Sequence, residues 1–173
     1  MNRFFRSLAA VGVVLSIATV AGCGGGSSSP ADFSLAQDET HVTEVDLVPK
    51  VTDENPVVKN VGDVMAFDAQ LTKDGAPFGE LFGEQTVVAE PAEWAPERTD
   101  EVRRVELNFV LPDGQITVQG TSTYPKGDWR FSVGKPVVRA IVGGTGAYAG
   151  ARGEHTGTRQ EDGTFTHLFH FVD

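Results

Sequence analysis

Apolar residues recur at every second position in segment after segment of this chain. In "RRVELNFVL", Val105, Leu107 and Phe109 alternate with Glu106 and Asn108. This period of two is typical of a half-buried β-strand, because successive side chains of a strand point to opposite faces. Signals for helices are almost absent. The pattern therefore predicts an all-β chain.

Eight segments are expected to form strands joined by short turns. Asp113-Gly114 and Asp162-Gly163 each predict a tight hairpin, the first with a two-residue type I′ turn, whereas the proline that follows Asp74-Gly75 predicts a looser loop. Such strands form either a sandwich or a closed barrel, and an eight-stranded barrel leaves an interior about the size of one small ligand. The expected strands lie near residues 40–48, 62–72, 79–89, 102–111, 115–124, 136–143, 151–160 and 164–172.

The N-terminus has the layout of a secretion signal. "MNRFFRSLAAVGVVLSIATVAGC" places two arginines before an uncharged apolar stretch that is too short and too early to predict a permanent membrane span. Its last four residues resemble the lipobox of bacterial lipoproteins, which implies lipidation of Cys23. We expect a lipoprotein signal peptide at 1–22, a lipidated cysteine with a flexible Gly/Ser tether at 23–34, and a secreted protein anchored in the cell envelope, outside the cytoplasm. The alternative is an ordinary signal peptide with a chance cysteine.

One domain of ordinary size is expected to follow at residues 35–173. Cys23 is the only cysteine of the chain, so this domain contains no disulfide. The formal net charge of the chain is −10, and its charges are mixed along the sequence, as on a solvated surface. An acidic protein repels phosphate backbones, so nucleic acid is not an expected partner.

A glycine-rich stretch, "VVRAIVGGTGAYAGARGEHTG", contains the pattern G-x-G-x-x-A at Gly144, Gly146 and Ala149. A dinucleotide-binding loop needs a helix directly after such glycines, because the helix N-terminus holds the pyrophosphate. The further glycines that follow would each cost about 1 kcal/mol in a helix relative to alanine. We therefore expect these glycines at a bend between two strands, where they allow positive φ angles and close backbone approach.

The same stretch resembles the corresponding turn of plant dirigent proteins, in which an apolar strand runs into G-G-T-G, an aromatic residue and A-R-G. The wider pattern, with "VGDVMAFDAQL", "FGELFGEQTVV", "DGQITVQG" and a last strand rich in phenylalanine, also resembles allene oxide cyclases. The resemblance covers roughly residues 40–172. It implies the fold shared by both families, an eight-stranded antiparallel closed β-barrel that usually assembles as a homotrimer.

The resemblance also implies candidate catalytic residues. Glu44 and Asp46 fall on a glutamate and an asparagine that take part in ligand contact or electrostatics in allene oxide cyclases. They share one face of a strand, where a lumenal position would raise the pKa of at least one carboxyl group; the alternative is that both face solvent. Ala69 and Gln85 replace an asparagine and a cysteine of that family, which argues against allene oxide itself as the substrate. Further candidates for ligand binding at the lumen or its mouth, with an outward position as the alternative, are Asp68, Gln85, Asn108 and Tyr148.

No metal site and no cofactor are expected. His167 and His170 are three residues apart on one strand, so they point to opposite faces. His155 and His167 are close enough in the last hairpin to meet across it, but two ligands do not make a zinc site. No strand–turn–helix element is expected that would present a nucleophilic serine.

The expected function is that of a lipid-anchored envelope barrel that encloses a small hydrophobic molecule. Its activity would be isomerase-like cyclisation or stereochemical steering, which needs shape and a few fixed dipoles rather than a nucleophile. One alternative is a non-catalytic carrier or binding barrel for a hydrophobic metabolite or lipid. Another is a structural barrel filled by its own side chains, which an empty cavity above roughly 300 Å³ would exclude.

Overall fold

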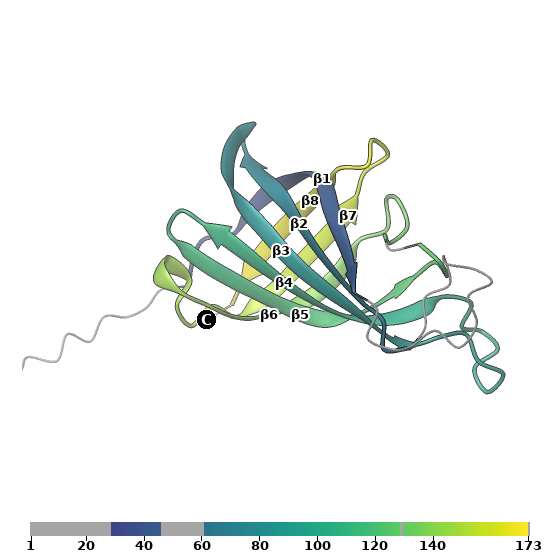
Figure 1. Cartoon of the computed structure of the whole chain (residues 1–173). Helices are drawn as coiled ribbons and strands as arrows, with labels where there is room; N and C mark the ends of the chain where they lie inside the picture. The colour runs from purple at the N-terminus through teal and green to yellow at the C-terminus, as the bar shows by residue number, and fades with distance from the viewer. Residues whose placement is uncertain (1–28, 46–60, 129, 173) are drawn as a thin grey trace, which may run out of the picture.

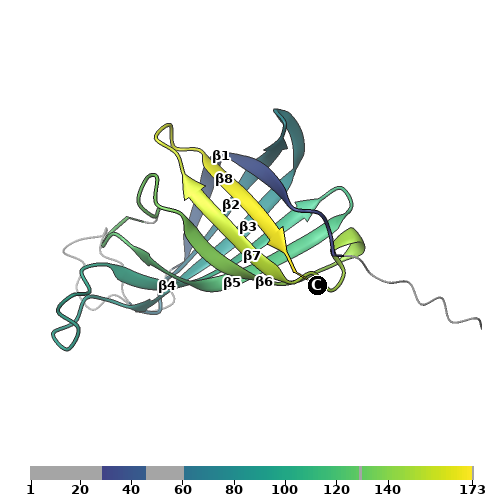
Figure 2. The ribbon, with the colours of Figure 1, turned by 180° about the vertical axis from the view of Figure 1, so that it is seen from behind.

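The protein is an eight-stranded closed antiparallel β-barrel, which confirms the predicted fold class (Figure 1). This computed structural model describes residues 29–45, 61–128 and 130–172, of which 38–45 are described by their backbone alone. Each strand pairs with the next, and the last pairs with the first to close the barrel, as the view from behind shows (Figure 2). The strands are β1 (Phe33–Val45), β2 (Val64–Lys73), β3 (Ala76–Ala89), β4 (Glu101–Leu111), β5 (Gly114–Tyr124), β6 (Val137–Gly144), β7 (Gly153–Arg159) and β8 (Phe165–Phe171).

Alternating side chains of the strands fill the interior. In β8, Phe165, His167, Phe169 and Phe171 are buried, and the residues between them are exposed. Phe109 of β4 packs edge-on against Phe169, with the ring centroids 4.9 Å apart. Burial of a phenylalanine side chain contributes about 1.5–3 kcal/mol. The inward aromatic rings of β4 and β8 therefore form much of the core that stabilises the closed barrel.

The connections between strands give the barrel two different ends (Figure 1). The turn end carries the tight β2–β3 and β4–β5 turns and a short 3-10 helix, η1 (Gly146–Tyr148). The loop end carries longer connections, at residues 90–100, 125–136 and 160–164. Within the part of the chain that the structure describes, no helix has the length and apolarity needed to cross a lipid bilayer.

Aromatic rings seal the turn end. Phe33 stacks on Phe169 with a centroid distance of 4.8 Å, and Tyr148 is buried near Phe171 in a stacked arrangement. The ammonium group of Lys73 lies 5.2 Å and 5.1 Å from the ring centroids of Phe33 and Phe78. Because these groups close the turn end, free space inside the barrel lies towards the loop end.

The first strand is displaced from its predicted position. It was expected near residues 40–48, but β1 begins at Phe33 and ends at Val45. Its first half pairs with β8, where Phe33 lies opposite Phe169, and its second half pairs with β2. Gln37 breaks the apolar alternation of this first half, although it is buried. A buried amide among apolar positions is the reason that the pattern conceals the start of the strand.

The turn between β2 and β3 is tighter than predicted. Lys73 pairs with Ala76, so Asp74 and Gly75 form a two-residue turn, and the positive φ of 53° at Asp74 is typical of a type I′ turn. The predicted looser loop is therefore wrong. Pro77 does not disturb the turn, because the register of the β2–β3 ladder shifts beside it.

The other two hairpins are present, but their turns differ from the sequence patterns. Leu111 pairs with Gly114, so the two-residue turn consists of Pro112 and Asp113. The proline ring fixes φ near −65°, which excludes the predicted type I′ geometry. The connection predicted at Asp162-Gly163 is not a two-residue turn but a loop of residues 160–164, between the paired ends of β7 and β8.

The glycine-rich stretch has the architectural role that was predicted. Gly144 lies where a Cβ atom would be 2.5 Å from the carbonyl oxygens of Gln115 and Tyr148, so no larger residue fits. Gly146 has a φ of +60°, a conformation that L-residues with side chains rarely adopt. The three-residue helix η1 follows the glycines, in place of the longer helix that a dinucleotide site requires.

Candidate functional site

A small cavity lies inside the barrel towards the loop end. Its volume is about 40 Å³, room for about three water molecules. This is well below the roughly 300 Å³ of a typical small-molecule pocket, so the size that would exclude a filled barrel is not reached. The apolar lining comes mainly from β2, β3 and β4, and the polar lining mainly from β1, β5, β6, β7 and β8. The lining residues are Gln37, Phe67, Leu81, Gln85, Val105, Leu107, Tyr124, Arg130, Phe131, Arg139, His155, Gly157, Phe165 and His167.

A chain of three buried polar side chains crosses the polar wall. Nε2 of His167 lies 2.8 Å from Oε1 of Gln37, and Nδ1 of His167 lies 2.9 Å from Nε2 of His155. Because an amide oxygen only accepts hydrogen bonds, Nε2 of His167 carries a proton and donates it to Gln37. The unprotonated Nδ1 of His167 then accepts from Nε2 of His155. Both imidazoles are thereby set as neutral rings.

The surroundings of the two histidines keep them neutral. His155 and His167 are 0% and 4% exposed. Burial lowers the pKa of His167 to about 3, with the positive charge of Arg139 acting in the same direction. Burial, and then the neighbouring His167 and Arg139, hold the pKa of His155 well below its ordinary value. In this arrangement Nδ1 of His155 is buried and has no hydrogen-bond partner.

Arg139 and Tyr124 form a second polar pair in the same wall. Nη2 of Arg139 donates to the hydroxyl oxygen of Tyr124 at 3.0 Å, and the guanidinium lies 5.9 Å from the ring centroid of Phe131. Nε of Arg139 is buried without a partner. Burial raises the pKa of Tyr124, opposed by the charges of Arg139 and Arg103, so its hydroxyl group stays protonated. Burial also lowers the pKa of Arg139, but a guanidinium starts from so high a value that it remains charged.

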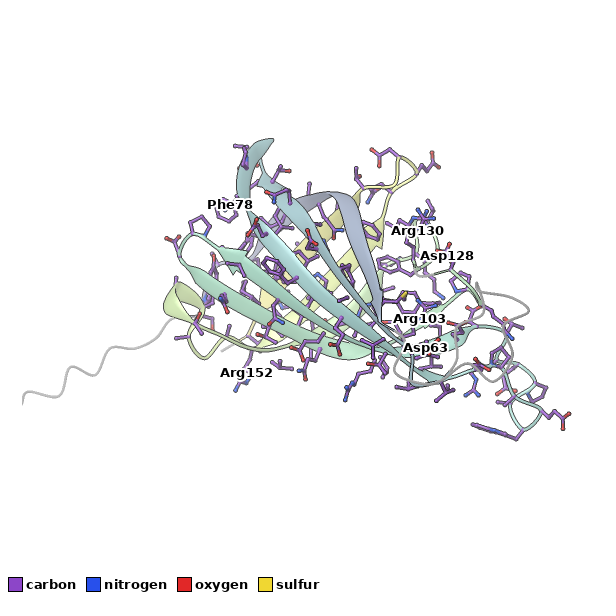
Figure 3. The ribbon with its side chains drawn as sticks, viewed as in Figure 1. Asp63, Phe78, Arg103, Asp128, Arg130 and Arg152 are labelled. Carbon is purple, nitrogen blue, oxygen red and sulfur yellow. The ribbon has the colours of Figure 1, made fainter. Side chains whose placement is uncertain are left out.

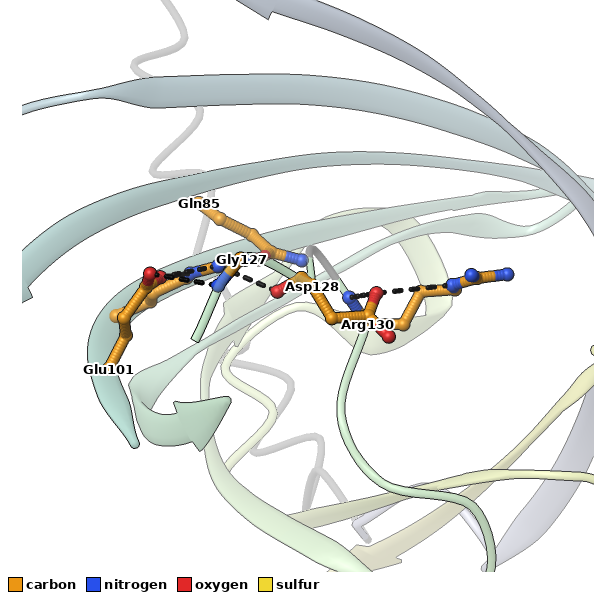
Figure 4. Close-up of polar contacts among 6 residues, drawn as sticks. Gln85, Glu101, Gly127, Asp128 and Arg130 are labelled. Atoms are coloured by element: carbon orange, nitrogen blue, oxygen red, sulfur yellow. Dashed lines mark hydrogen bonds and ion pairs between the residues drawn. The ribbon is translucent and has the colours of Figure 1, made fainter. Parts of the chain in front are cut away.

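A buried ion pair at the loop end orders the connection beside the cavity (Figure 4). Nη2 of Arg103 donates to Glu101 at 2.6 Å and to the carbonyl oxygen of Asp128 at 2.7 Å. Nη1 of Arg103 donates to Oε1 of Gln85 at 3.1 Å, and the backbone N–H of Gly127 donates to Glu101 at 3.2 Å. Every nitrogen of this guanidinium therefore has an acceptor, and the contacts attach the β5–β6 connection to the barrel.

The described residues of that connection, 125–128 and 130–136, are called the lid loop below. Phe131 of the lid loop is buried and packs edge-on against Tyr124 and Phe165, with centroid distances of 6.2 Å and 5.3 Å. Arg130 lines the cavity beside it and pairs with Asp128 at 3.4 Å (Figure 3). The lid loop thus contributes one aromatic and one cationic side chain to the cavity wall.

The predicted site residues do not gather at one place. Gln85 is buried in the cavity wall, where Arg103 holds its amide oxygen. Tyr148 is buried at the opposite, turn end of the barrel. Asp68 is exposed on β2, and Asn108 lies on the outer face of β4, where it donates to Glu106.

The remaining predicted residues are described only in part or not at all. Glu44 belongs to β1, where its backbone lies opposite Met65, and its side chain is outside the described atoms. Asp46 and Cys23 lie outside the described residues. Arg152 lies in the glycine-rich stretch; it is exposed and donates to its neighbouring carbonyl at Ala151, and Figure 3 shows it pointing away from the barrel.

Sequence reasoning missed most of the polar wall. It placed His155 and His167 within reach of each other across the last hairpin, and the structure confirms this contact. It did not single out Gln37, Tyr124 or Arg139. Strand parity was the available signal, because each of these residues shares the inward face of its strand with buried apolar residues, Leu35 for Gln37, Ile116 and Val118 for Tyr124, and Ile141 for Arg139. Among the described residues, no group of three or more histidine, cysteine or acidic side chains is placed to hold a metal ion.

The comparisons with known proteins agree with the barrel fold. The chain belongs to the family described as the allene oxide cyclase barrel like domain, whose model matches residues 43–166. This confirms the family resemblance seen in the sequence. No curated protein sequence matches the chain.

Solved structures with this fold include several enzymes. A pyocyanin demethylase is similar with a TM-score of 0.59 and 22% identity, over 82% of this chain and 100% of the other. The Diels–Alderase AbmU from Streptomyces koyangensis has a TM-score of 0.55 and 15% identity, over 80% and 66%. A nonspecific heme-binding cyclase that catalyses a [4 + 2] cycloaddition during neoabyssomicin biosynthesis has a TM-score of 0.52 and 16% identity, over 81% and 63%. At these identities the likeness concerns the fold.

Proposed function

We propose that the barrel binds a small, largely apolar molecule in the cavity beneath the lid loop and directs its cyclisation or stereochemistry. The observation that carries this proposal is the combination of apolar walls with two buried polar atoms that lack partners, Nδ1 of His155 and Nε of Arg139. Buried polar groups normally find hydrogen-bond partners, so two partnerless ones beside free space suit a bound polar group. Two structurally similar proteins are named as catalysts of cycloaddition, which agrees with this chemistry.

The proposed catalysis is restriction of a reactive conformer together with fixed dipoles. The aromatic and aliphatic wall would select a folded conformer of the ligand, and Arg139 and Tyr124 would stabilise charge that develops on one of its oxygen atoms. The two histidines are poor proton acceptors because their pKa values are lowered. Their role in this proposal is therefore to orient the ligand by hydrogen bonds rather than to remove a proton.

The cavity must enlarge to admit such a ligand. We propose that Phe131 moves with the lid loop, because it is the aromatic side chain that this connection inserts between Tyr124 and Phe165. A ring in a surface connection is displaced more readily than one on a paired strand.

The test uses a variant that fills the cavity. Gly157 lines it, and a Cβ atom there would lie 3.3 Å from His155 and 3.7 Å from Phe131. Gly157→Val should abolish co-purification of a small molecule with the full chain from its own host, detected by native mass spectrometry. Gly143→Val is the matched control, because a Cβ atom at Gly143 meets only the end of Arg152 at 3.9 Å. If both variants retain the same molecule, the cavity is not its site.

Turnover separates an enzyme from a carrier, the second candidate function. A carrier is favoured by the described lining of the cavity, which contains no serine, threonine, cysteine, lysine or carboxylate. An intramolecular cyclisation leaves the mass unchanged, so the released molecule has to be compared with the supplied one by chromatographic retention and NMR. An unchanged molecule would overturn the catalytic proposal and leave the carrier.

Glu44 and Asp46 remain proposed acid–base residues. The proposal rests on their family positions and on their spacing of two residues in the sequence, which predicts that they share one face of a strand. Glu44→Gln should lower turnover without loss of the retained ligand. Equal turnover in the variant and the wild type would remove Glu44 from the mechanism.

We also propose that Cys23 is lipidated and anchors the barrel in the cell envelope, and that the barrel assembles as a homotrimer. The anchor proposal rests on the signal-like N-terminus, and the trimer on the family resemblance. Native mass spectrometry of the same sample reports the stoichiometry, and a monomer at every concentration would overturn the trimer.

A further inference from the structure

The charge of the cavity is opposite to that of the protein. The whole chain has a formal net charge of −10. The described residues that line the cavity include two arginines, Arg130 and Arg139, and no aspartate or glutamate. Arg130 is paired with Asp128. Arg139, which is 4% exposed, forms its hydrogen bond with the neutral hydroxyl group of Tyr124. One buried positive charge therefore faces the cavity without a carboxylate partner among the described residues.

A buried cation without an anion is costly, because the protein interior solvates charge poorly. The nearest titratable neighbours do not neutralise the charge of Arg139. Tyr124 stays protonated, and His155 and His167 stay neutral. The Arg103–Glu101 pair is already balanced internally. An anion that enters the cavity is the remaining way to neutralise Arg139.

The two partnerless atoms lie on neighbouring residues. Arg139 of β6 and His155 of β7 are directly paired across the ladder. A Cβ atom at Gly157 would lie 3.3 Å from Cε1 of His155 and 3.9 Å from Nη1 of Arg139, so both side chains border the same space. One polar group of a ligand placed there can reach both residues.

We propose that this wall binds an ionised oxygen of an otherwise apolar ligand, a phenolate, enolate or carboxylate, with Arg139 as its counter-ion. The inference rests on the proposed function, since it names the class of ligand that the same cavity takes. Nε of Arg139 is a buried N–H donor without a partner, from which such an oxygen can accept a hydrogen bond. A charge-assisted hydrogen bond of this kind is about twice as strong as a neutral one.

The chain of Gln37, His167 and His155 can adapt to the anion. With the amide oxygen of Gln37 as acceptor, Nδ1 of His155 is a hydrogen-bond acceptor, which an anion would avoid. Half a turn of the Gln37 amide, with a change of tautomer in both imidazoles, reverses every hydrogen bond of the chain. Nδ1 of His155 then becomes a donor to the bound oxygen, and both rings remain neutral.

The experiment measures the ionisation of a chromophoric probe bound to the full chain. The probe is 4-nitrophenol, whose phenolate absorbs at longer wavelength than the phenol, and its methyl ether 4-nitroanisole is the form that cannot ionise. The wild type should bind the phenolate at least about tenfold more tightly than the phenol, which lowers the pKa of the bound probe by one unit or more. Arg139→Met should abolish this preference and still bind 4-nitroanisole. Arg152→Met, which removes an exposed arginine from the same chain, should leave the preference unchanged.

The outcomes separate the inference from the proposed function. Binding of both probes without a preference for the phenolate, or a preference that survives Arg139→Met, overturns the anion site alone. Failure of both probes to bind the wild type overturns the cavity as a ligand site. If Arg139→Met does not fold, a competition experiment with the wild type tests the anion site instead. Benzoate should then displace the bound phenolate at least about tenfold better than benzamide, and equal competition overturns the inference.

Discussion

At the scale of single residues, the ion pair of Arg103 and Glu101 makes a direct prediction for stability. Both side chains are 0% exposed, and removal of one charge leaves the other buried without its counter-ion. Glu101→Gln should lower the free energy of unfolding by about 3–5 kcal/mol. The measurement is urea unfolding followed by circular dichroism.

A matched control exists on the same strand. Glu106 is exposed and accepts hydrogen bonds from Asn108 and Gln119 with its two oxygens, of which the carbonyl oxygen of a glutamine can keep one. Glu106→Gln should change the free energy of unfolding by no more than about 0.5 kcal/mol. Equal losses in the two variants would mean that burial of the ion pair is not the cause. The double variant Glu101→Gln/Arg103→Met should recover part of the loss, because no unpaired charge remains.

The two buried histidines predict how stability depends on pH. In the unfolded chain both imidazoles bind a proton below about pH 6.5, whereas in the folded barrel the pKa of His167 is about 3 and that of His155 is also far below its ordinary value. The unfolded state therefore binds more protons in this interval, and the free energy of unfolding falls as the pH drops from 6.5 towards 3. Each histidine contributes up to about 1.4 kcal/mol per pH unit. His167→Gln should make the dependence shallower, as read from urea midpoints at several pH values.

His170 is the control for this prediction, because its contribution to the free energy of unfolding changes with pH in the opposite direction. It is exposed on the same strand, and a hydrogen bond to Asp32 raises its pKa. The stabilisation that His170 gains from Asp32 is present at low pH and is lost as the pH rises through the pKa of His170 in the folded protein. In an NMR titration between about pH 5 and 8, only the His170 ring of these three should shift. A shift of the His155 or His167 ring in that range would contradict the neutral pair.

At the scale of elements, the proposed movement of the lid loop makes a prediction for access to the cavity. Phe131→Ala removes the ring that packs on Tyr124 and Phe165, which enlarges the cavity and should cost about 3 kcal/mol of stability. Binding of 4-nitroanisole should become faster, because the ring no longer has to move before the ligand enters. Stopped-flow fluorescence quenching measures this rate. Val133→Ala, at an exposed position of the same loop, should leave it unchanged.

The elements were more predictable than the turns that join them. The core of β4, from Val105 to Leu111, and β8 were evident from the sequence because their inward positions are mostly apolar. The start of β1 was hidden because its inward Gln37 owes its burial to a hydrogen bond with His167, 130 residues away. The type of each turn depended on the strand register, which decides whether an Asp-Gly pair occupies the two central positions or the positions beside them.

The candidate site was less predictable because its contacts, like that of Gln37 with His167, join residues far apart in the sequence. Its polar wall consists of side chains from β1, β5, β6, β7 and β8 that meet only when the barrel closes. Tyr124 and Arg139 are separated by the lid loop in sequence, and nothing local to either marks their contact. The outward position of Asn108, in contrast, is the alternative that its alternation with Leu107 and Phe109 left open when it was named as a candidate.

At the scale of the whole molecule, the two ends of the described chain suggest how an anchored protein would present its cavity. The first and last described residues both lie at the turn end: the hydroxyl group of Ser29 donates to the carbonyl oxygen of Val172, and Asp32 accepts from the backbone of Phe171. A lipid on Cys23 would therefore attach the barrel by the end that aromatic rings seal. The lid loop and the cavity lie towards the other end, so we expect an anchored barrel to take up its ligand from the aqueous side.

The lipid anchor and the position of the cavity away from it can be tested in one experiment. Wild-type protein expressed in a bacterial host should incorporate labelled palmitate and partition into the detergent phase of a Triton X-114 extract, whereas Cys23→Ser should do neither, because the serine hydroxyl cannot form the thioether to the lipid. Affinity for 4-nitroanisole should be the same in the two proteins, since the sealed turn end separates the lipid from the cavity. A wild type that remains in the aqueous phase without label would contradict the lipoprotein assignment. A cavity whose affinity changes on loss of the lipid would contradict the orientation inferred here from the Ser29 and Asp32 contacts.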